Sequence, residues 1–235
     1  MLIPEQQDVA IGLKYAPEVE RQMGGKIPDE SLRNYVDSVG QRIARVSQRP
    51  DLEYHFVAVE DDSVNAFALP GGYIFITEGM LVGLSTEAQL AAILAHETAH
   101  IVARDSSAAM SREIGIGILL SAVTSDKMPQ SVSTVANLTR QILGLQYSRD
   151  DEREADLAGL DYMVAAGYSP YGMIEGMQML ESQQRSRPID FFSTHSSPEN
   201  RIAYLERKIQ SSYSLAGLRV GKEDYYRYVL RRFND

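Results

Sequence analysis

The sequence contains no cysteine among its 235 residues. This absence excludes cysteine nucleophiles, disulfide bonds and thiolate metal ligands together. Long apolar runs are missing too, because the most apolar stretch, residues 114–123, is much shorter than the roughly 20 residues that cross a bilayer. We therefore expect no transmembrane span.

Basic residues are outnumbered. The chain has 23 Lys and Arg against 32 Asp and Glu, which gives a formal net charge of -9. Phosphate groups bind to basic surfaces, so we expect no nucleic-acid partner. Hydrophobic residues make up 44% of the chain and charged residues 23%, the composition of an ordinary globular protein.

The hydrophobic spacing predicts a mainly helical α+β protein. Alternating residues predict strands at 54–60 and 73–77, and 64–69 is a further extended segment. We expect these to form a small antiparallel sheet of about three strands. Nearly all of the remaining chain has helical spacing. The expected helices are 5–23, a helix capped by Asp29, and 78–84, 86–104, 107–124, 130–146, 149–166, 171–184 and 198–210.

No repeat or shift in composition marks a domain boundary. We therefore expect residues 1–235 to form a single domain, with a core at about 5–210. Residues 211–235 are a C-terminal extension under this interpretation. The end of this extension is aromatic and basic, and the sequence assigns it no role.

The motif H-E-T-A-H at residues 96–100 carries the clearest chemistry. His96 and His100 are four residues apart in a predicted helix, so both imidazoles project from one face and can reach one Zn²⁺. Glu97 points beside the metal, where it can act as general base on the attacking water. The alternative is a chance match in a core helix. Only four histidines occur in the chain, and two are here.

A second pair of polar residues, Glu152 and Asp156, also has helical spacing. A catalytic zinc needs three protein ligands and one open position, so Glu152 is the candidate for the third ligand. Asp156 could then accept the free ring N–H of a ligating histidine and fix its tautomer. The alternative is a solvated acidic face, because four acidic residues cluster here.

His195 lies in a loop before a predicted helix, in which Ser197 is the expected N-cap and Pro198 the first residue. If His195 and Arg201 both face the metal, either could stabilise the oxyanion of the tetrahedral intermediate. The alternative is that His195 is a surface loop residue. We interpret His55, in a predicted strand, as structural.

Three segments together resemble a known family. H-E-T-A-H at 96–100, E-R-E-A-D at 152–156 and T-H-S-S-P-E-N-R at 194–201 are similar to the zinc metallopeptidases that include HtpX, BepA and the CAAX prenyl proteases (peptidase family M, number forty-eight). The segment 65–77 resembles the strand that precedes the catalytic helix in that family. The resemblance covers roughly residues 5–210.

The resemblance implies a gluzincin-type zincin fold with one Zn²⁺ per chain. Glu152 would be the third ligand, Asp156 would support a ligating histidine, and His195 and Arg201 would line the site. In some relatives the equivalent of His195 binds the metal and must swing away, so His195 could be an oxyanion stabiliser, a self-inhibitory ligand or both. Strand 72–76 would be the cleft edge that pairs with substrate backbone. The substrate-binding residues implied are Asn65, Gly72, Tyr73, Ile74 and Phe75.

The chain departs from the family pattern in three ways. It lacks the membrane helices of the integral members, which favours the soluble BepA-like branch. It has only about 25 residues after residue 210, where that branch often carries helical repeats. Ser196 stands where many relatives have proline, which affects the conformation of the loop rather than the chemistry.

The function expected from these features is a zinc metalloendopeptidase that hydrolyses unfolded or misassembled polypeptides, in envelope protein quality control. One alternative is a chaperone-like polypeptide-binding module with a latent zinc site, in which segment 105–148 could plug the cleft. An aminopeptidase would need an acidic anchor for the substrate N-terminus, and we identify none.

The expected location is the periplasm or cell envelope of a bacterium, as for soluble relatives. The N-terminus runs straight into charged residues and shows no signal peptide. This indicates either a removed leader or a cytoplasmic protein, and composition does not decide between them. Membrane association would require the missing leader or other proteins.

Overall fold

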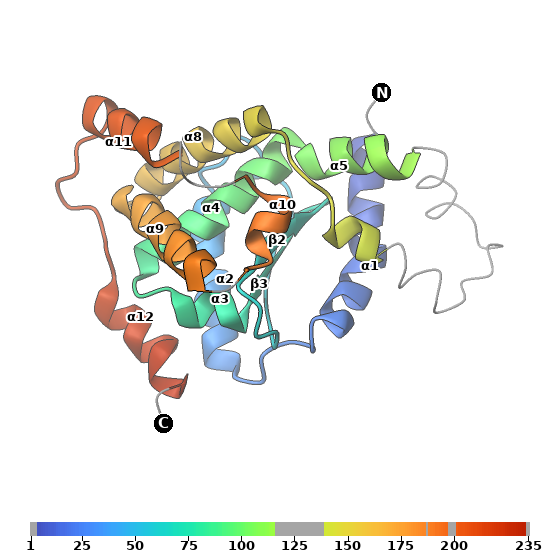
Figure 1. The fold of residues 1–235 in the computed structure, drawn as a ribbon, viewed down its shortest axis with the longest axis horizontal. Coiled ribbons are helices and arrows are strands. Elements are labelled where there is room, and N and C mark those ends of the chain that lie inside the picture. Colours follow the sequence, from blue (N-terminus) through green and yellow to red (C-terminus); the bar gives the residue numbers. More distant parts are fainter. Residues whose placement is uncertain (1–3, 116–138, 187, 197–200, 234–235) are drawn as a thin grey trace.

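The structure is a computed structural model that describes residues 4–115, 139–186, 188–196 and 201–233. A small sheet lies between helix α1 on one face and a group of helices, beginning with α2 and α4, on the other (Figure 1). The elements with described bounds, besides the strands, are α1 (Glu5–Gln22), α2 (Glu30–Ala44), α3 (Glu78–Gly83), α4 (Glu87–Ala103), α5 (Asp105–Met110), η1 (Ser111–Gly115), α8 (Arg149–Ala165), α9 (Tyr171–Ser186), α10 (Phe191–Thr194), α11 (Arg201–Ser212), α12 (Lys222–Tyr228) and η3 (Leu230–Phe233).

The sheet consists of β1 (His55–Val59), β2 (Ala66–Leu69) and β3 (Tyr73–Thr77), in the order β1-β3-β2. β2 pairs with β3 in the antiparallel sense, but β1 pairs with β3 in the parallel sense. The expected antiparallel sheet is therefore wrong for β1, and the sheet is mixed. Only the β2–β3 connection is a tight turn, in which Gly71 and Gly72 have φ values of 80° and 99°. The chain that leaves β1 instead passes to the opposite edge of the sheet, where it forms β2.

β3 is consequently the central strand, with a hydrogen-bonded neighbour on each side. The expectation that residues 72–76 form the edge of the cleft is therefore wrong, because a central strand has no unpaired backbone groups to offer. The two outer strands of the sheet are β1 and β2.

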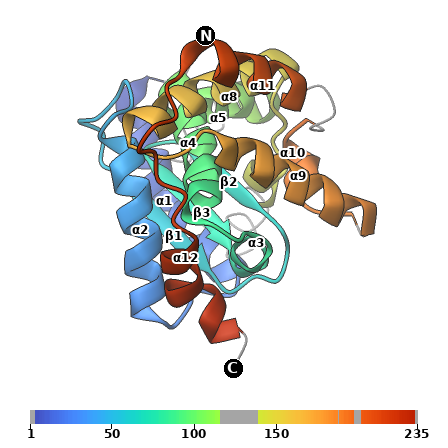
Figure 2. The same ribbon diagram turned by 90° about the vertical axis from the view of Figure 1, so that its left-hand side faces the viewer.

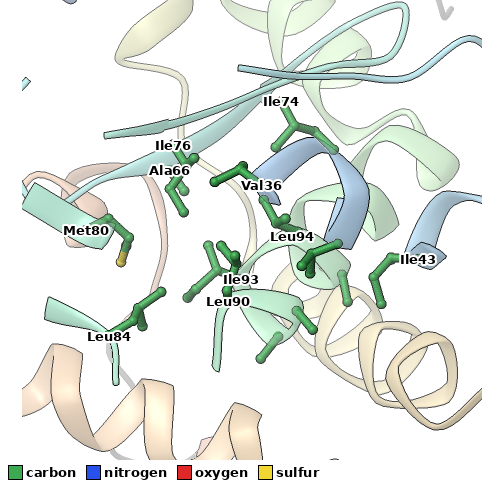
Figure 3. Close-up of a cluster of buried hydrophobic side chains, with 14 of the residues drawn as sticks. Val36, Ile43, Ala66, Ile74, Ile76, Met80, Leu84, Leu90, Ile93 and Leu94 are labelled. Atoms are coloured by element: carbon green, nitrogen blue, oxygen red, sulfur yellow. The ribbon is translucent and has the colours of Figure 1, made fainter. Parts of the chain in front are cut away.

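The side chains of the strands alternate between two apolar faces. One face packs on α1, and its cluster includes Phe67, Leu69 and Phe75 with Ile11, Tyr15 and Val19. The other face packs on α2 and α4. Figure 3 shows this second cluster, in which side chains from α2, β2, β3 and α4 point toward one another: Val36, Ile43, Ala66, Ile74, Ile76, Leu90 and Leu94. Burial of both faces explains why a sheet of three short strands is stable.

Helix α4 runs through the middle of the fold (Figure 2). It begins after Thr86, whose hydroxyl accepts the N–H of Gln89, and 15 of its 17 residues are buried. A helix that is apolar around its whole circumference can be stable only inside a core. Polar groups on α4 are therefore enclosed by protein, chiefly by α8 and α9.

The chain after α11 folds back over the amino end of α4 (Figure 2). The carbonyl groups of Val220 and Gly221 accept the N–H groups of Ala88 and Glu87. They therefore satisfy two of the four N–H groups that the start of a helix leaves without a partner. Further along, the side chains of Tyr225 and Val229 are fully buried in the main core.

A buried carboxylate fixes this contact. Glu87 is fully buried and accepts hydrogen bonds from the hydroxyls of Tyr35 and Tyr168 and from the guanidinium groups of Arg42 and Arg219. The four donors come from α2, from the connection after α8 and from the segment before α12. One side chain of α4 thus joins three parts of the chain.

The described helices agree closely with those expected from the spacing up to α4, and again for α8 and α9. The expected helix 107–124 lies partly outside the described residues, and its described part is α5 followed by the π-helical turn η1. Most of the expected helix 130–146 also lies outside them. The short elements α10, α12 and η3 were not expected. No helix in the described residues is long and apolar enough to cross a membrane.

Candidate metal centre

Helix α4 supplies the first two donors of the site. His96 and His100 are one helical turn apart, and both side chains are buried. Their Nε2 atoms lie 3.1 Å from each other, and the rings are perpendicular. The spacing in the sequence therefore brings both nitrogens to one point, as expected.

Helix α8 supplies the third donor. Glu152 lies in its first turn, which is fixed by a capping box between Ser148 and Asp151. Oε1 of Glu152 lies 3.3 Å from Nε2 of His100 and 3.8 Å from Nε2 of His96. Gly159 allows α8 to approach α4 this closely, because a Cβ there would lie 3.3 Å from the backbone nitrogen of His96.

The fourth donor is His195, which ends the short helix α10. Nδ1 of His195 lies 2.7 Å from Oε1 of Glu152 and 3.3 Å from Nε2 of His96. The ring stacks on Phe191 from the same helix, with 4.3 Å between the ring centres. His195 is therefore buried beside the other donors and is not a surface loop residue.

The donor atoms of these four residues all lie within 4.8 Å of one another. Ligand atoms bound at about 2.0–2.2 Å in a tetrahedron are themselves about 3.3–3.6 Å apart. Five of the six pairs of donors are separated by 2.7 to 3.8 Å, values on either side of that range. Three imidazoles and one carboxylate are also ligands that zinc accepts. The residues present thus fit a divalent metal ion.

Glu97 lies next to this group. Both of its carboxylate oxygens are buried, and neither has a hydrogen-bond partner among the described residues. Oε1 lies 3.5 Å from Nε2 of His195, which is also buried without a hydrogen bond. Buried polar atoms normally have hydrogen-bond partners, so these atoms are available to a ligand or to a water molecule that reaches the site.

A layer of carboxylates and one arginine surrounds the donors. Nδ1 of His96 lies 3.0 Å from Oδ1 of Asp156, in an ion-pair contact that is poorly aligned for a hydrogen bond. Arg201 binds both oxygens of Asp156, with nitrogen–oxygen distances of 2.7 and 2.6 Å. Its third nitrogen donates to Oε2 of Glu152 at 2.6 Å. Arg201 thus holds the two carboxylates in place.

The hydrogen bonds of Arg201 differ from those expected of an oxyanion-stabilising group. The sequence predicts Arg201 as one of two candidates for that role, but its guanidinium already binds Asp156, Glu152 and the carbonyl of Ser196. Arg201 is therefore a positioning residue in this arrangement. The expected N-cap Ser197 and the helix start at Pro198 lie outside the described residues.

These charges shift the titration of the buried groups. Burial by itself raises the pKa of the Asp156 carboxyl. Arg201 and His96 lower it by more, so that the pKa is about 2. Burial also raises the pKa of the Glu152 carboxyl, and the surrounding imidazoles bring it well below its usual range. Both carboxylates are consequently ionised at neutral pH, and this favours a cation between the imidazoles.

Two neighbours of His100 were missed by the sequence analysis. Nδ1 of His100 lies 2.8 Å from Oδ2 of Asp105. The ring of Tyr147 stacks on the imidazole, with 4.0 Å between centres, and its hydroxyl lies 2.9 Å from the hydroxyl of Ser106. Asp105 follows the helix by only two residues, so an acidic residue soon after the second histidine was the one available signal. Nothing in the sequence singles out Tyr147.

The expected substrate-binding residues are divided by the strand order. Gly72, Tyr73, Ile74 and Phe75 lie at the start of or within the central strand β3, and Ile74 and Phe75 are fully buried. Asn65 instead immediately precedes the edge strand β2, and its buried Oδ1 atom has no hydrogen-bond partner among the described residues. His55 stacks on Tyr73 within the sheet, away from the other three histidines.

The outer edge of β2 can be assigned from its hydrogen bonds. The N–H of Thr77 donates to the carbonyl of Asn65 across the sheet, so alternate residues, Ala66 and Ala68, direct their backbone groups outward. The hydroxyl of Ser106 donates to the carbonyl of Ala68, at one end of this edge. Among the described residues, no other strand pairs with it.

Comparisons with known proteins give a consistent result. The family described as Peptidase family M48 matches residues 30–209. The chain is 38% identical over 177 residues to the mitochondrial metalloendopeptidase OMA1 of Schizosaccharomyces pombe, covering 73% of this chain and 51% of that protein. It is 29% identical over 213 residues to the beta-barrel assembly-enhancing protease of Yersinia pestis, covering 84% and 43%, and 30% identical over 199 residues to that of Escherichia coli, covering 78% and 40%. The chain thus spans about half the length of these relatives, or less.

Proposed function

The chain belongs to peptidase family M48, and from this premise we propose that it is a zinc-dependent endopeptidase acting on unfolded or misassembled polypeptides. The observation that carries the proposal is the buried group of four donors within 4.8 Å, with the unpaired carboxylate of Glu97 beside it. The relatives that are named as metalloendopeptidase and as protease support the same reaction class.

In the proposed reaction, His96, His100 and Glu152 would hold one zinc ion per chain. Bound zinc supplies Lewis-acid polarisation of the scissile carbonyl and increases the acidity of a nearby water. Glu97 takes the proton from the attacking water and later passes it to the leaving amine. Asp156 and Asp105 orient the two imidazoles, and Arg201 fixes Asp156 and Glu152.

His195 occupies the position that an open catalytic site would leave to substrate. A catalytic zinc keeps one position free of protein ligands, whereas here His195 completes a set of four donors. We therefore propose that the described conformation is a self-inhibited resting state, and that α10 moves when substrate binds. The chaperone-like alternative shares this resting state but predicts no hydrolysis at any stage.

The edge strand β2 is the proposed docking edge for substrate backbone. An extended peptide can add to an exposed sheet edge through main-chain hydrogen bonds. On this edge, the carbonyl of Val64 accepts the N–H of Phe191 and the carbonyl of Ala68 accepts the hydroxyl of Ser106. The outward N–H and C=O groups of Ala66 lie between these two contacts. Asn65, whose side-chain oxygen has no hydrogen-bond partner among the described residues, is the one expected substrate-binding residue that lies beside this edge.

The proposed setting is protein quality control in a bacterial envelope. The support is the similarity to beta-barrel assembly-enhancing proteases over most of this chain. The similarity to a mitochondrial relative indicates that the domain itself is used in more than one setting.

The test compares zinc content and casein cleavage in wild type and the Glu97→Gln variant. We expect both proteins to bind about one zinc, and the variant to be at least about a hundredfold slower, the usual contribution of a general base. Glu154→Gln, an exposed residue of α8, is the matched control and should cleave at the wild-type rate. Full activity in Glu97→Gln would contradict the mechanism. Zinc binding without any cleavage by wild type would favour the chaperone-like alternative.

A further inference from the structure

A small cavity lies beside His96. It has a volume of about 20 Å³ and lies between α4, α9 and α10. Ala92 and Ile93 line it from α4, in the turn before His96. Met173 and Met177 line it from α9, and Phe192 from α10. The imidazole of His96 thus belongs both to the wall of the cavity and to the candidate metal centre.

The lining is almost entirely apolar. Its only charged members are Asp156 and Arg201, which bind each other through two hydrogen bonds. Neither charge is therefore available to a charged group that enters the cavity, and such a group would be desolvated without a partner. An apolar side chain would lose nothing by entering and would gain from leaving water.

The size of the cavity depends on methionine. The present volume accommodates about one water-sized group, which is less than any large side chain needs. Methionine side chains are unbranched and have three rotatable bonds, so they repack around different shapes more readily than other apolar residues do. Met173 and Met177 are one helical turn apart on α9, and together they form one wall.

We propose that this cavity is a specificity pocket for an apolar substrate side chain next to the scissile bond, and that Met173 and Met177 determine which side chain it accepts. The inference rests on the proposed peptidase function, and it identifies the class of substrate. A residue beside the scissile bond has to lie against the metal ligands, and His96 is both a ligand in that proposal and a wall of the cavity.

The experiment uses quenched fluorescent peptides of one parent sequence. Each position flanking the cleaved bond is varied in turn among Leu, Phe, Gly, Asp and Lys. We expect one flanking position to favour Leu or Phe over Asp and Lys by at least about tenfold in kcat/KM, in keeping with the discrimination of apolar pockets. If kcat/KM is the same for all five side chains at each of the two flanking positions, the proposal is overturned.

Variants of α9 connect the preference to the cavity. Met177→Ala enlarges it, so the ratio of Phe to Leu cleavage should rise several-fold. Met177→Leu keeps the volume and should preserve the wild-type ratio. Met179→Ala, which lies on the same helix outside the cavity lining, is the matched control. A ratio that is unchanged in Met177→Ala would remove this residue from the pocket.

A binding measurement separates this inference from the proposed function. Fluorescence anisotropy with the same peptides and the Glu97→Gln variant reports affinity without cleavage. If wild type cleaves nothing but the variant binds the apolar peptides more tightly, the peptidase function fails and the pocket stands. If wild type cleaves casein while neither binding nor cleavage depends on the flanking residue, the function stands and the pocket fails.

Discussion

Nδ1 of His100 lies 2.8 Å from Oδ2 of Asp105, two residues beyond the end of α4. The residue between, Arg104, has φ +64°, the one positive φ of a non-glycine residue among those described. This left-handed turn ends the helix and brings Asp105 back against the imidazole. The side chain of Arg104 donates to Asp8 of α1 at 2.7 Å. The second histidine is thus oriented by the way the helix ends.

Replacing Asp105 should weaken metal binding. In Asp105→Ala the ring of His100 loses the acceptor that fixes its tautomer, so we expect zinc affinity to fall by about 10–100-fold. Competition with a chelator measures this change. Asp51→Ala, in an exposed loop, is the control. An unchanged affinity would show that Tyr147 and the helix alone suffice to orient the imidazole.

Replacing Glu152 should remove a ligand. We expect Glu152→Ala to contain much less than one zinc per chain. The variant loses the only anionic member of the proposed ligand set, and the positive charge of Arg201 would then lie near the site without the carboxylate of Glu152. Elemental analysis after dialysis gives the stoichiometry. Glu154→Ala, at an exposed position two residues further along α8, should retain full zinc. Equal stoichiometry in the two variants would exclude Glu152 from the ligand set.

Replacing His195 separates its two possible roles. In the proposed resting state His195 blocks the open position, so His195→Ala should keep its zinc on the other three ligands and cleave casein faster than wild type. Zinc content and initial rate are measured on the same preparation. Retained zinc with a slower rate would instead assign His195 to stabilisation of the oxyanion.

Gly159 should be intolerant of a side chain. A Cβ there would lie 3.0 Å from Cε of Met173 and 3.3 Å from the backbone of α4, so Gly159→Ala should push α8 outward and move Glu152 with it. We expect lower zinc affinity and lower thermal stability. Gly176 has no atom within 4 Å of the corresponding position. Gly176→Ala should therefore be neutral or stabilising by up to about 1 kcal/mol. If Gly159→Ala and Gly176→Ala lose similar amounts of thermal stability, the packing argument is contradicted.

Glu87 should contribute to stability without contributing to the chemistry. Glu87→Gln keeps the shape but replaces one acceptor with a donor, which leaves buried hydroxyl groups of Tyr35 or Tyr168 unpaired. We expect a loss of about 2–4 kcal/mol in the free energy of unfolding, from one or two buried groups without partners. Urea unfolding measures it, with Glu223→Gln on the exposed face of α12 as control. An unchanged midpoint would show that Arg42 and Arg219 rearrange to satisfy these groups.

Residues that are close in sequence were the ones that could be predicted. His96, Glu97 and His100 are within one turn, and so are Glu152 and Asp156, because helical spacing alone puts them on one face. The resemblance to a family then joined the two helices. The match to the family confirms the resemblance itself, and in the structure the candidate donors of both helices lie together.

Features that depend on tertiary packing could not be predicted in this way. The parallel pairing of β1 with β3 follows from the path of the chain between strands, which hydrophobic alternation does not encode. The role of Arg201 follows from which side of Glu152 it approaches. Asp105 reaches His100 only because Arg104 adopts a left-handed conformation, for which arginine has no local preference.

The contact of residues 219–221 with the amino end of α4 has a consequence for biosynthesis. A chain is made from its N-terminus, so α4 emerges from the ribosome more than a hundred residues before the carbonyl groups that cap it. Until then its first N–H groups lack these carbonyl partners, and the carboxylate of Glu87 lacks the guanidinium of Arg219. The helix that bears His96 and His100 is thus completed late, after nearly all of the described chain has been synthesised.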